Sequence, residues 1–170
     1  MKKTFAPLVL AAILPLFSCH KEEMKGPPMM KSYDAPAIEL ADVFGKKVSL
    51  SDFKGKPVMV NFWATWCAPC VGEMPQLQKL QELRKAAGLV VIEVNYKEPG
   101  EVVEKFVKKY GVSLIVLVDD KGVAAQKYEV FGLPTTYFID KDGVVKYSYL
   151  GELTREVINM GLKKIGVEEI

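Results

Sequence analysis

The stretch that decides the fold of this chain is Asn61-Phe62-Trp63-Ala64-Thr65-Trp66-Cys67-Ala68-Pro69-Cys70. It overlaps a nearly continuous apolar run, Val58 to Ala64, which is typical of a central strand buried on both faces. A helical pattern follows at once, from about Cys67 to Ala87, and Gly88 is expected to end it. The expected inward stripe of this helix is Met74, Leu77, Leu80 and Leu83, with a kink at Pro75. The sequence therefore predicts a Cys-x-x-Cys pair where a buried strand meets the first turn of a helix.

Further strands and helices are expected on both sides of this junction. A hairpin is expected around Gly45, between Ile38–Leu40 and Val48–Leu50. After the first helix, strands are expected over residues 89–94, 114–118, 135–139 and 144–150, and helices over 101–110, 123–129 and after a cap at Thr154. This alternation predicts an α/β sandwich with a mixed sheet.

The position of the two cysteines favours redox chemistry. A thiol at a helix N-terminus faces unpaired backbone N–H groups and the positive end of the helix dipole, which favour the thiolate. Cys67 is expected to be the exposed nucleophile, and Cys70 the more buried thiol that resolves a mixed disulfide. Pro69 suits the first helical turn because it has no N–H to lose.

Two structural roles for the pair fit the chain less well. A structural zinc site needs four ligands, and beyond Cys67 and Cys70 the sequence offers only Cys19 and His20. A disulfide that spans two residues closes a very small loop and stabilises little. We therefore expect no metal, and no cofactor other than a redox-active Cys67–Cys70 disulfide.

The first eighteen residues are expected to be a lipoprotein signal peptide. A basic pair precedes an apolar run, Phe5 to Phe17, which is shorter than the roughly 20 residues of a membrane span. The run ends in Leu16-Phe17-Ser18-Cys19, which resembles a bacterial lipobox and implies lipidation of Cys19; a plain secretory signal is the alternative. Residues 19–35 are then expected to be a flexible tether and residues 36–170 the folded domain.

The composition is that of a globular protein, with 49% hydrophobic and 26% charged residues. The formal net charge of +2 comes from Lys2 and Lys3 in the signal peptide. A mature chain without net charge gives no reason to expect a nucleic-acid partner. With Cys19 lipidated, Cys67 and Cys70 are the free pair of an exported protein in an oxidising compartment.

Four motifs between residues 36 and 166 carry a family resemblance. They are the opening stretch, Glu73-Met74-Pro75, Gly132-Leu133-Pro134-Thr135-Thr136 and the leading segment Val48–Lys56. With these motifs the chain resembles the thioredoxin superfamily, and within it the TlpA/ResA-like periplasmic thiol–disulfide oxidoreductases. The resemblance implies a thioredoxin-like three-layer sandwich with a mixed central sheet, an N-terminal β-hairpin and an extra strand/helix insertion.

The resemblance also implies roles for single residues. Pro134 would be cis and would lie beside the cysteines, and the backbone of Leu133 would pair with an extended substrate segment. The substrate-binding residues would be Trp66, Ala68, Pro69, Leu133 and Thr135. Trp63 is expected either to pack around the site or to be an ordinary core aromatic.

Glu73 is expected to handle the proton of Cys70. Thioredoxin has a buried aspartate six residues before its first cysteine, whereas this chain has Asn61, whose amide cannot accept a proton. Glu73 follows Cys70 by three residues and therefore shares its helix face. A partly buried carboxyl there would have a raised pKa and could exchange a proton with the thiol. A solvated glutamate is the alternative.

These observations predict a thiol–disulfide oxidoreductase of the cell envelope. The uncharged Ala68-Pro69 pair favours a reductant, because strong oxidants stabilise the thiolate further. By resemblance, the substrates would be disulfides of exported proteins, among them the haem-site cysteines of apocytochrome c, and a CcdA/DsbD-type membrane thiol donor would recharge the protein. We expect a monomer, anchored through Cys19 and facing the periplasm or another extracytoplasmic side.

Three other functions stay open at this level. A disulfide-forming oxidase would have the same fold and a higher potential. A peroxiredoxin-like peroxidase would have a Thr-x-x-Cys motif after a proline, whereas this chain has Thr65-Trp66-Cys67. A non-enzymatic binding module or copper carrier conflicts with the absence of histidine other than His20.

Overall fold

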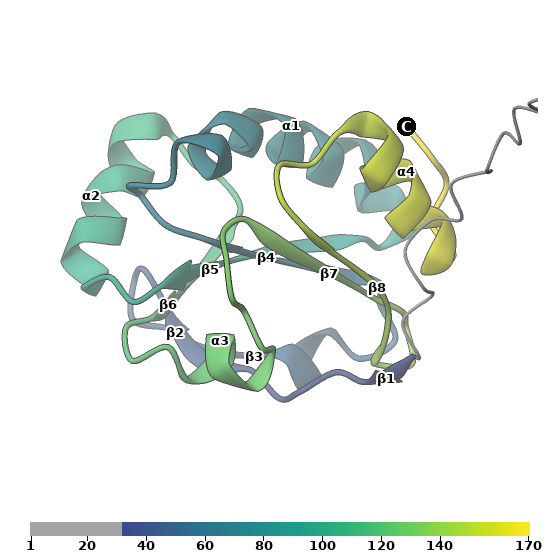
Figure 1. Cartoon of the computed structure of the whole chain (residues 1–170), viewed down its shortest axis with the longest axis horizontal. Helices are drawn as coiled ribbons and strands as arrows, with labels where there is room; N and C mark the ends of the chain where they lie inside the picture. The colour runs from purple at the N-terminus through teal and green to yellow at the C-terminus, as the bar shows by residue number, and fades with distance from the viewer. Residues whose placement is uncertain (1–31) are drawn as a thin grey trace, which may run out of the picture.

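The computed structural model of the chain describes residues 32–170 (Figure 1). Its centre is an eight-stranded sheet with the order β1-β8-β7-β4-β5-β6-β2-β3. The strands are β1 (Tyr33–Asp34), β2 (Glu39–Asp42), β3 (Lys47–Ser49), β4 (Val58–Trp63), β5 (Val90–Tyr96), β6 (Ile115–Asp119), β7 (Thr135–Ile139) and β8 (Val144–Leu150). The helices are η1 (Leu50–Phe53), α1 (Ala68–Arg84), η2 (Lys85–Ala87), α2 (Gly100–Tyr110), α3 (Val123–Lys127) and α4 (Arg155–Lys164).

Strand β4 is the middle of the sheet, as its apolar run predicts. It pairs in parallel with β5 and antiparallel with β7, so the sheet is mixed. All six of its residues are buried. Since side chains alternate along a strand, Met59 and Trp63 pack on one face and Val60 and Phe62 on the other.

Helices cover both faces of the sheet and complete a three-layer sandwich. In Figure 1, α1, α2 and α4 lie above the sheet and α3 lies below it. The three-layer sandwich with a mixed sheet is confirmed, and so is the hairpin, formed by β2 and β3. The insertion consists of α2 and β6, which lie between β5 and α3 and extend the sheet beyond β5.

The first helix follows the prediction except at Leu83. Met74, Leu77 and Leu80 are buried, but the side chain of Leu83 is 51% exposed. Nine residues separate Met74 from Leu83, which is about two and a half helical turns, so the two side chains point to opposite faces. The helix continues without a break through Pro75.

The start of the folded domain differs from the predicted boundary at residue 36. Tyr33 and Asp34, placed by the prediction in the tether, form the edge strand β1 and pair with Val145 and Val144 of β8. The N–H of Ala35 also donates to the carbonyl of Gly143 at 2.9 Å. A two-residue strand carries no periodic signal, which is why the sequence did not reveal it. The rest of the predicted tether, the signal peptide and Cys19 lie outside the described residues.

Candidate active site

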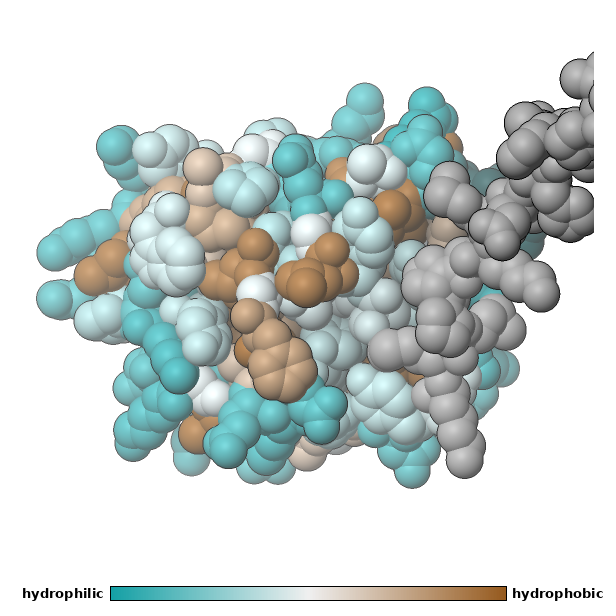
Figure 2. Space-filling model, in the orientation of Figure 1, coloured by the Kyte–Doolittle hydropathy of each residue, from teal (hydrophilic) through white to brown (hydrophobic). Residues whose placement is uncertain are grey.

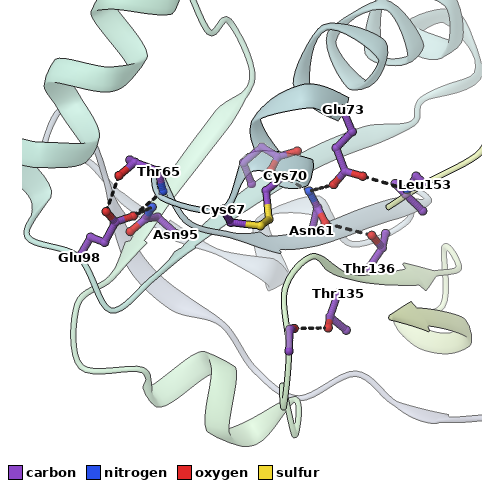
Figure 3. The surroundings of a disulfide bond; sticks show 12 residues. Asn61, Thr65, Cys67, Cys70, Glu73, Asn95, Glu98, Thr135, Thr136 and Leu153 are labelled. Carbon is purple, nitrogen blue, oxygen red and sulfur yellow. Dashed lines mark hydrogen bonds between the residues drawn. A yellow bond between two sulfur atoms is a disulfide. The ribbon is translucent and has the colours of Figure 1, made fainter. Parts of the chain in front are cut away.

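Cys67 and Cys70 form a disulfide at the start of α1, with their Cα atoms 5.3 Å apart (Figure 3). Cys67 is the N-cap residue of the helix, and Pro69 lies in the first turn. The N–H of Cys67 donates to the carbonyl of Ala64 at 3.1 Å, which turns the chain sharply from β4 into the helix. The sequence therefore places the pair correctly at the strand–helix junction.

The expected exposure of Cys67 is wrong for the disulfide state. Cys67 is only 5% exposed and Cys70 is fully buried. Both belong to an apolar cluster with Trp63 and Met74, against which Leu133 packs. Trp63 is fully buried and is thus a core aromatic that also contacts the site. The disulfide joins Cys67 directly to the buried Cys70, so both sulfurs lie in the same buried cluster.

The loop before β7 faces the disulfide, as Figure 3 shows. Its Leu133–Pro134 peptide bond is cis, as the resemblance implies. Pro134 is buried, and its carbonyl accepts a hydrogen bond from the N–H of Gly151 at 2.9 Å. The hydroxyl of Thr135 donates to the carbonyl of Gly132 at 2.6 Å. The side chain of Thr135 therefore supports the loop from inside rather than contributing to an exposed surface.

The other residues expected to bind substrate lie on the surface around the disulfide. Trp66 is 68% exposed, and Ala68 and Pro69 are exposed as well. Two apolar side chains near the cis-proline loop, Phe131 and Leu150, are also exposed. Figure 2 shows hydrophobic side chains gathered near the centre of the visible face, over the segment that joins α3 to β7. A surface of this kind suits an apolar, extended segment of another protein.

Glu73 lies in the interior next to the cysteines, on the second turn of α1. Its Oε1 accepts a hydrogen bond from Asn61 Nδ2 at 3.0 Å, and its Oε2 accepts one from the N–H of Leu153 at 2.9 Å. Burial raises the pKa of Glu73 to about 7, although these two hydrogen bonds oppose the rise, and the charge of Glu152 adds to it. A carboxyl that titrates near neutrality suits proton exchange with a thiol.

A second buried carboxyl, Glu93 of β5, was not expected from the sequence. Its Oε2 accepts a hydrogen bond from the same Asn61 Nδ2 at 3.1 Å, and its Oε1 has no hydrogen-bond partner. Burial raises the pKa of Glu93 to about 8, with a further rise from the charge of Glu73 and an opposing effect of Asn61. A signal was present in the sequence, because Glu93 is the one charged residue of β5 and lies between the apolar Ile92 and Val94.

A third carboxyl, Glu98, was also missed, and it holds the segment before the cysteines. It accepts hydrogen bonds from the N–H and the hydroxyl of Thr65 and from the side-chain amide of Asn95 (Figure 3). Glu98 is 8% exposed. A glutamate in a loop between a strand and a helix carries no sequence pattern that distinguishes it from a solvated one.

The arrangement can carry out thiol–disulfide exchange. It combines two cysteines at a helix N-terminus, a buried acid that titrates near neutrality and a cis-proline loop facing the sulfurs. Within residues 32–170, no three histidine, cysteine, aspartate or glutamate side chains gather as a metal site.

Comparison with known proteins agrees with this chemistry. Residues 32–148 match the model of the AhpC/TSA family. Over 132 residues the chain is 42% identical to the thiol-disulfide oxidoreductase ResA of Bacillus thuringiensis subsp. konkukian, an alignment that covers 78% of this chain and 76% of the relative.

Two solved structures share the fold. One, from Chlorobium tepidum, is described as a thiol:disulfide interchange protein DsbE; it has a TM-score of 0.74 and 31% identity over 82% of this chain and 100% of its own. The other is the exposed lipoprotein thioredoxin Etrx1 of Streptococcus pneumoniae, with a TM-score of 0.68 and 32% identity over 76% of this chain and 99% of its own.

Proposed function

Because the chain belongs to the AhpC/TSA family of thioredoxin-like proteins and is a thiol–disulfide oxidoreductase of the ResA and DsbE type, we propose that it reduces disulfides of exported proteins. The observation that carries this proposal is the Cys67–Cys70 pair at the start of α1, next to a buried carboxyl whose pKa is about 7. Such a carboxyl can accept a proton from a nearby thiol and release it again near neutral pH.

The reaction starts from the reduced protein, which a thiol donor must regenerate. The thiolate of Cys67 attacks one sulfur of the target disulfide, a bond to Cys67 forms, and the first target thiolate leaves. Cys70 then gives its proton to the carboxylate of Glu73, and its thiolate attacks the sulfur of Cys67. The Cys67–Cys70 disulfide forms, the second target thiolate leaves, and two electrons have passed to the target. Glu73 then loses its proton to solvent, and solvent protonates the released thiolates.

The direction and the partners rest on the residues between the cysteines and on the resemblance. Ala68 and Pro69 add no charge that would stabilise the thiolate further, which favours a reductant over an oxidase. The cysteines of apocytochrome c that bind haem are the proposed targets within the exported proteins. A membrane thiol donor of the CcdA/DsbD type would return the electrons.

We place the protein at the cell envelope, anchored by a lipid on Cys19. The sequence of residues 1–19 supports this position, as does the similarity to a pneumococcal exposed lipoprotein. No helix within residues 32–170 has the length and apolar character needed to cross a membrane. The mass of the mature N-terminus tests the anchor: an acylated Cys19 is expected, and an unmodified terminus at another residue overturns it.

A redox titration against glutathione, combined with an insulin-reduction assay, tests the function. We expect a couple more reducing than glutathione and insulin reduction that is lost in Cys67→Ser. A couple more oxidising than glutathione would instead assign the oxidase. Turnover of hydrogen peroxide faster than reduction of insulin would assign a peroxidase, and insulin reduction that survives Cys67→Ser would refute an enzyme built on this pair.

A further inference from the structure

Two buried carboxyls share one amide group in the core of this protein. Asn61 and Glu93 are direct partners across the parallel pair β4 and β5, so their side chains leave the sheet on the same face. Helix α1 brings Glu73 to that face. Asn61 Nδ2 then donates to Glu73 Oε1 at 3.0 Å and to Glu93 Oε2 at 3.1 Å. The two N–H bonds of a single amide are therefore divided between two acids.

The orientation of this amide is fixed from its other end. The hydroxyl of Thr136 in β7 donates to Asn61 Oδ1 at 3.0 Å, so the oxygen of the amide faces β7 and its nitrogen faces the carboxyls. Asn61 itself is fully buried. A rotation of the amide would place its oxygen against two acceptors, which a buried site does not tolerate.

The two acids have no positively charged partner in the part of the chain that the structure describes. None of the ion pairs found within residues 32–170 includes Glu73 or Glu93. The charge of Glu152, just before α4, acts on Glu73 and has the same sign. Strand β6 places Val116 opposite Glu93, and the thiols of α1 are joined in the disulfide. Two negative charges so close together in a buried site oppose each other strongly.

We propose that Glu73 and Glu93 form one acid pair that holds a single negative charge through the amide of Asn61, and that Glu93 is a positioning residue that governs when Glu73 is free to take a proton from Cys70. The part played in exchange rests on the proposed function. Each acid loses its proton more readily while the other is neutral, so the pair titrates in two coupled steps rather than as two independent groups.

The unpartnered oxygen of Glu93 supports this assignment. A permanently charged Glu93 would leave Oε1 buried without any donor, which is costly. A neutral Glu93 also leaves that side of the carboxyl without a partner, but a neutral group costs far less to bury than a charge, and Oε2 still accepts from Asn61. The charge of the pair then stays mainly on Glu73, where the N–H of Leu153 supplies a further donor.

The test is a pH titration of the oxidised protein by NMR, with carboxyl-labelled glutamate. The disulfide form is chosen because neither cysteine titrates in it. We expect Glu73 and Glu93 to titrate broadly, each reporting both steps. The amide oxygen of Glu93→Gln can still accept from Asn61. In this variant Glu73 should titrate in a single step, which is complete at a pH about one unit lower than in the wild type. The exposed Glu82→Gln should leave both curves as they are in the wild type.

A reciprocal variant keeps the proposal falsifiable even when Glu93→Gln does not fold. Removing the charge of Glu73 in Glu73→Gln should let Glu93 ionise at lower pH. Single, independent titration curves in the wild type, or an unmoved Glu93 in Glu73→Gln, overturn the pair. With the reduced protein, Glu93→Gln should exchange thiols about twofold faster than the wild type near pH 7.5, because more Glu73 is ionised. A coupled titration together with an oxidising redox potential would contradict the proposed reductase function but would still support the acid pair.

Discussion

Glu98 holds Thr65 through both of its carboxylate oxygens: the backbone N–H of Thr65 donates to Oε2 at 2.7 Å and the hydroxyl donates to Oε1 at 2.5 Å. Asn95 Nδ2 adds a third hydrogen bond to Oε2 at 2.8 Å. Two residues further along the chain lies Cys67. The segment that presents the first cysteine is therefore attached to the loop after β5 by a buried carboxylate.

Removing this attachment should weaken both the fold and the activity. Glu98→Ala leaves the N–H of Thr65 and the amide of Asn95 without an acceptor, so we expect a loss of about 2 kcal/mol in the free energy of unfolding. Insulin reduction should fall about tenfold, because Cys67 is held less firmly. Glu98→Gln should restore most of both, since its amide oxygen can accept from the two nitrogen donors. Equal losses of stability and of insulin reduction in the two variants would show that the negative charge of Glu98 matters, rather than its hydrogen bonds to Thr65 and Asn95.

Glu73→Gln should slow thiol exchange without unfolding the domain. Glutamine retains an acceptor for Asn61 or Leu153 but cannot take a proton from Cys70. We expect the rate at pH 7 to fall by about a hundredfold, and the rise of the rate with pH around pH 7 to disappear. Stopped-flow exchange with a small disulfide, alongside circular dichroism, measures both. An unaltered pH profile would remove Glu73 from the mechanism.

The two cysteines should respond differently to the same substitution. Cys70→Ser leaves the nucleophile but removes the resolving thiol, so it should accumulate mixed disulfides on Cys67 that mass spectrometry identifies. Cys67→Ser should form none with the same targets. Mixed disulfides in Cys67→Ser but not in Cys70→Ser would reverse the two roles.

Stability should fall as pH rises, because burial raises the pKa of both Glu73 and Glu93, and Glu93 has the larger rise. In the unfolded chain the carboxyl of Glu93 has its ordinary pKa of 4.5, and in the folded protein the pKa is about 8. Between these values the folded state binds a proton that the unfolded state has lost, so the contribution of Glu93 is present below pH 4.5 and is lost progressively up to about pH 8. The full loss is on the order of 3–5 kcal/mol.

Urea unfolding at about pH 5 and pH 8 measures this loss. In Glu93→Gln the free energy of unfolding should change less between the two pH values than in the wild type. Glu82→Gln, on the exposed face of α1, should keep the wild-type dependence. Parallel curves for the wild type and Glu93→Gln would show that Glu93 is not protonated in the fold.

Leu77 and Leu83 provide a matched pair on one helix. Leu77 is fully buried, whereas Leu83 is 51% exposed. Leu77→Ala should cost about 2–5 kcal/mol of unfolding free energy, and Leu83→Ala less than about 0.5 kcal/mol. Chemical unfolding of the two variants side by side measures the difference. A large effect of Leu83→Ala would mean that this face of α1 is covered in solution.

Much of the fold could be predicted because the apolar periodicity is strong. The buried run of β4, the hairpin around Gly45 and the cap of α4 at Thr154, whose hydroxyl accepts from the N–H of Val157, are where the sequence places them. The misses have local causes. The stripe of α1 was extended by steps of three residues, which drift around a helix by the time they reach Leu83. The strand at Tyr33 is too short to show a pattern.

The site was predictable where chemistry depends on spacing along the chain. Cys67, Cys70, Glu73 and the cis peptide before Pro134 lie within recognisable motifs. Glu93 acts through a partner in the neighbouring strand, and Glu98 through a loop that folds back on Thr65. Such contacts depend on strand register and loop path, which the local sequence does not encode.

The edge strand β1 joins the sheet at the end that lies away from the two cysteines. A row of paired residues links Tyr33 across the sheet, through Val145 and Ile139, to Val58 at the beginning of β4. Cys67 follows the opposite end of that strand, roughly 20 Å away. A lipid anchor upstream of Tyr33 would therefore be attached to the end of the domain that lies away from its sulfurs. With the proposed tether in between, Cys67 would be able to face exported proteins on one side or turn toward an electron donor in the membrane on the other.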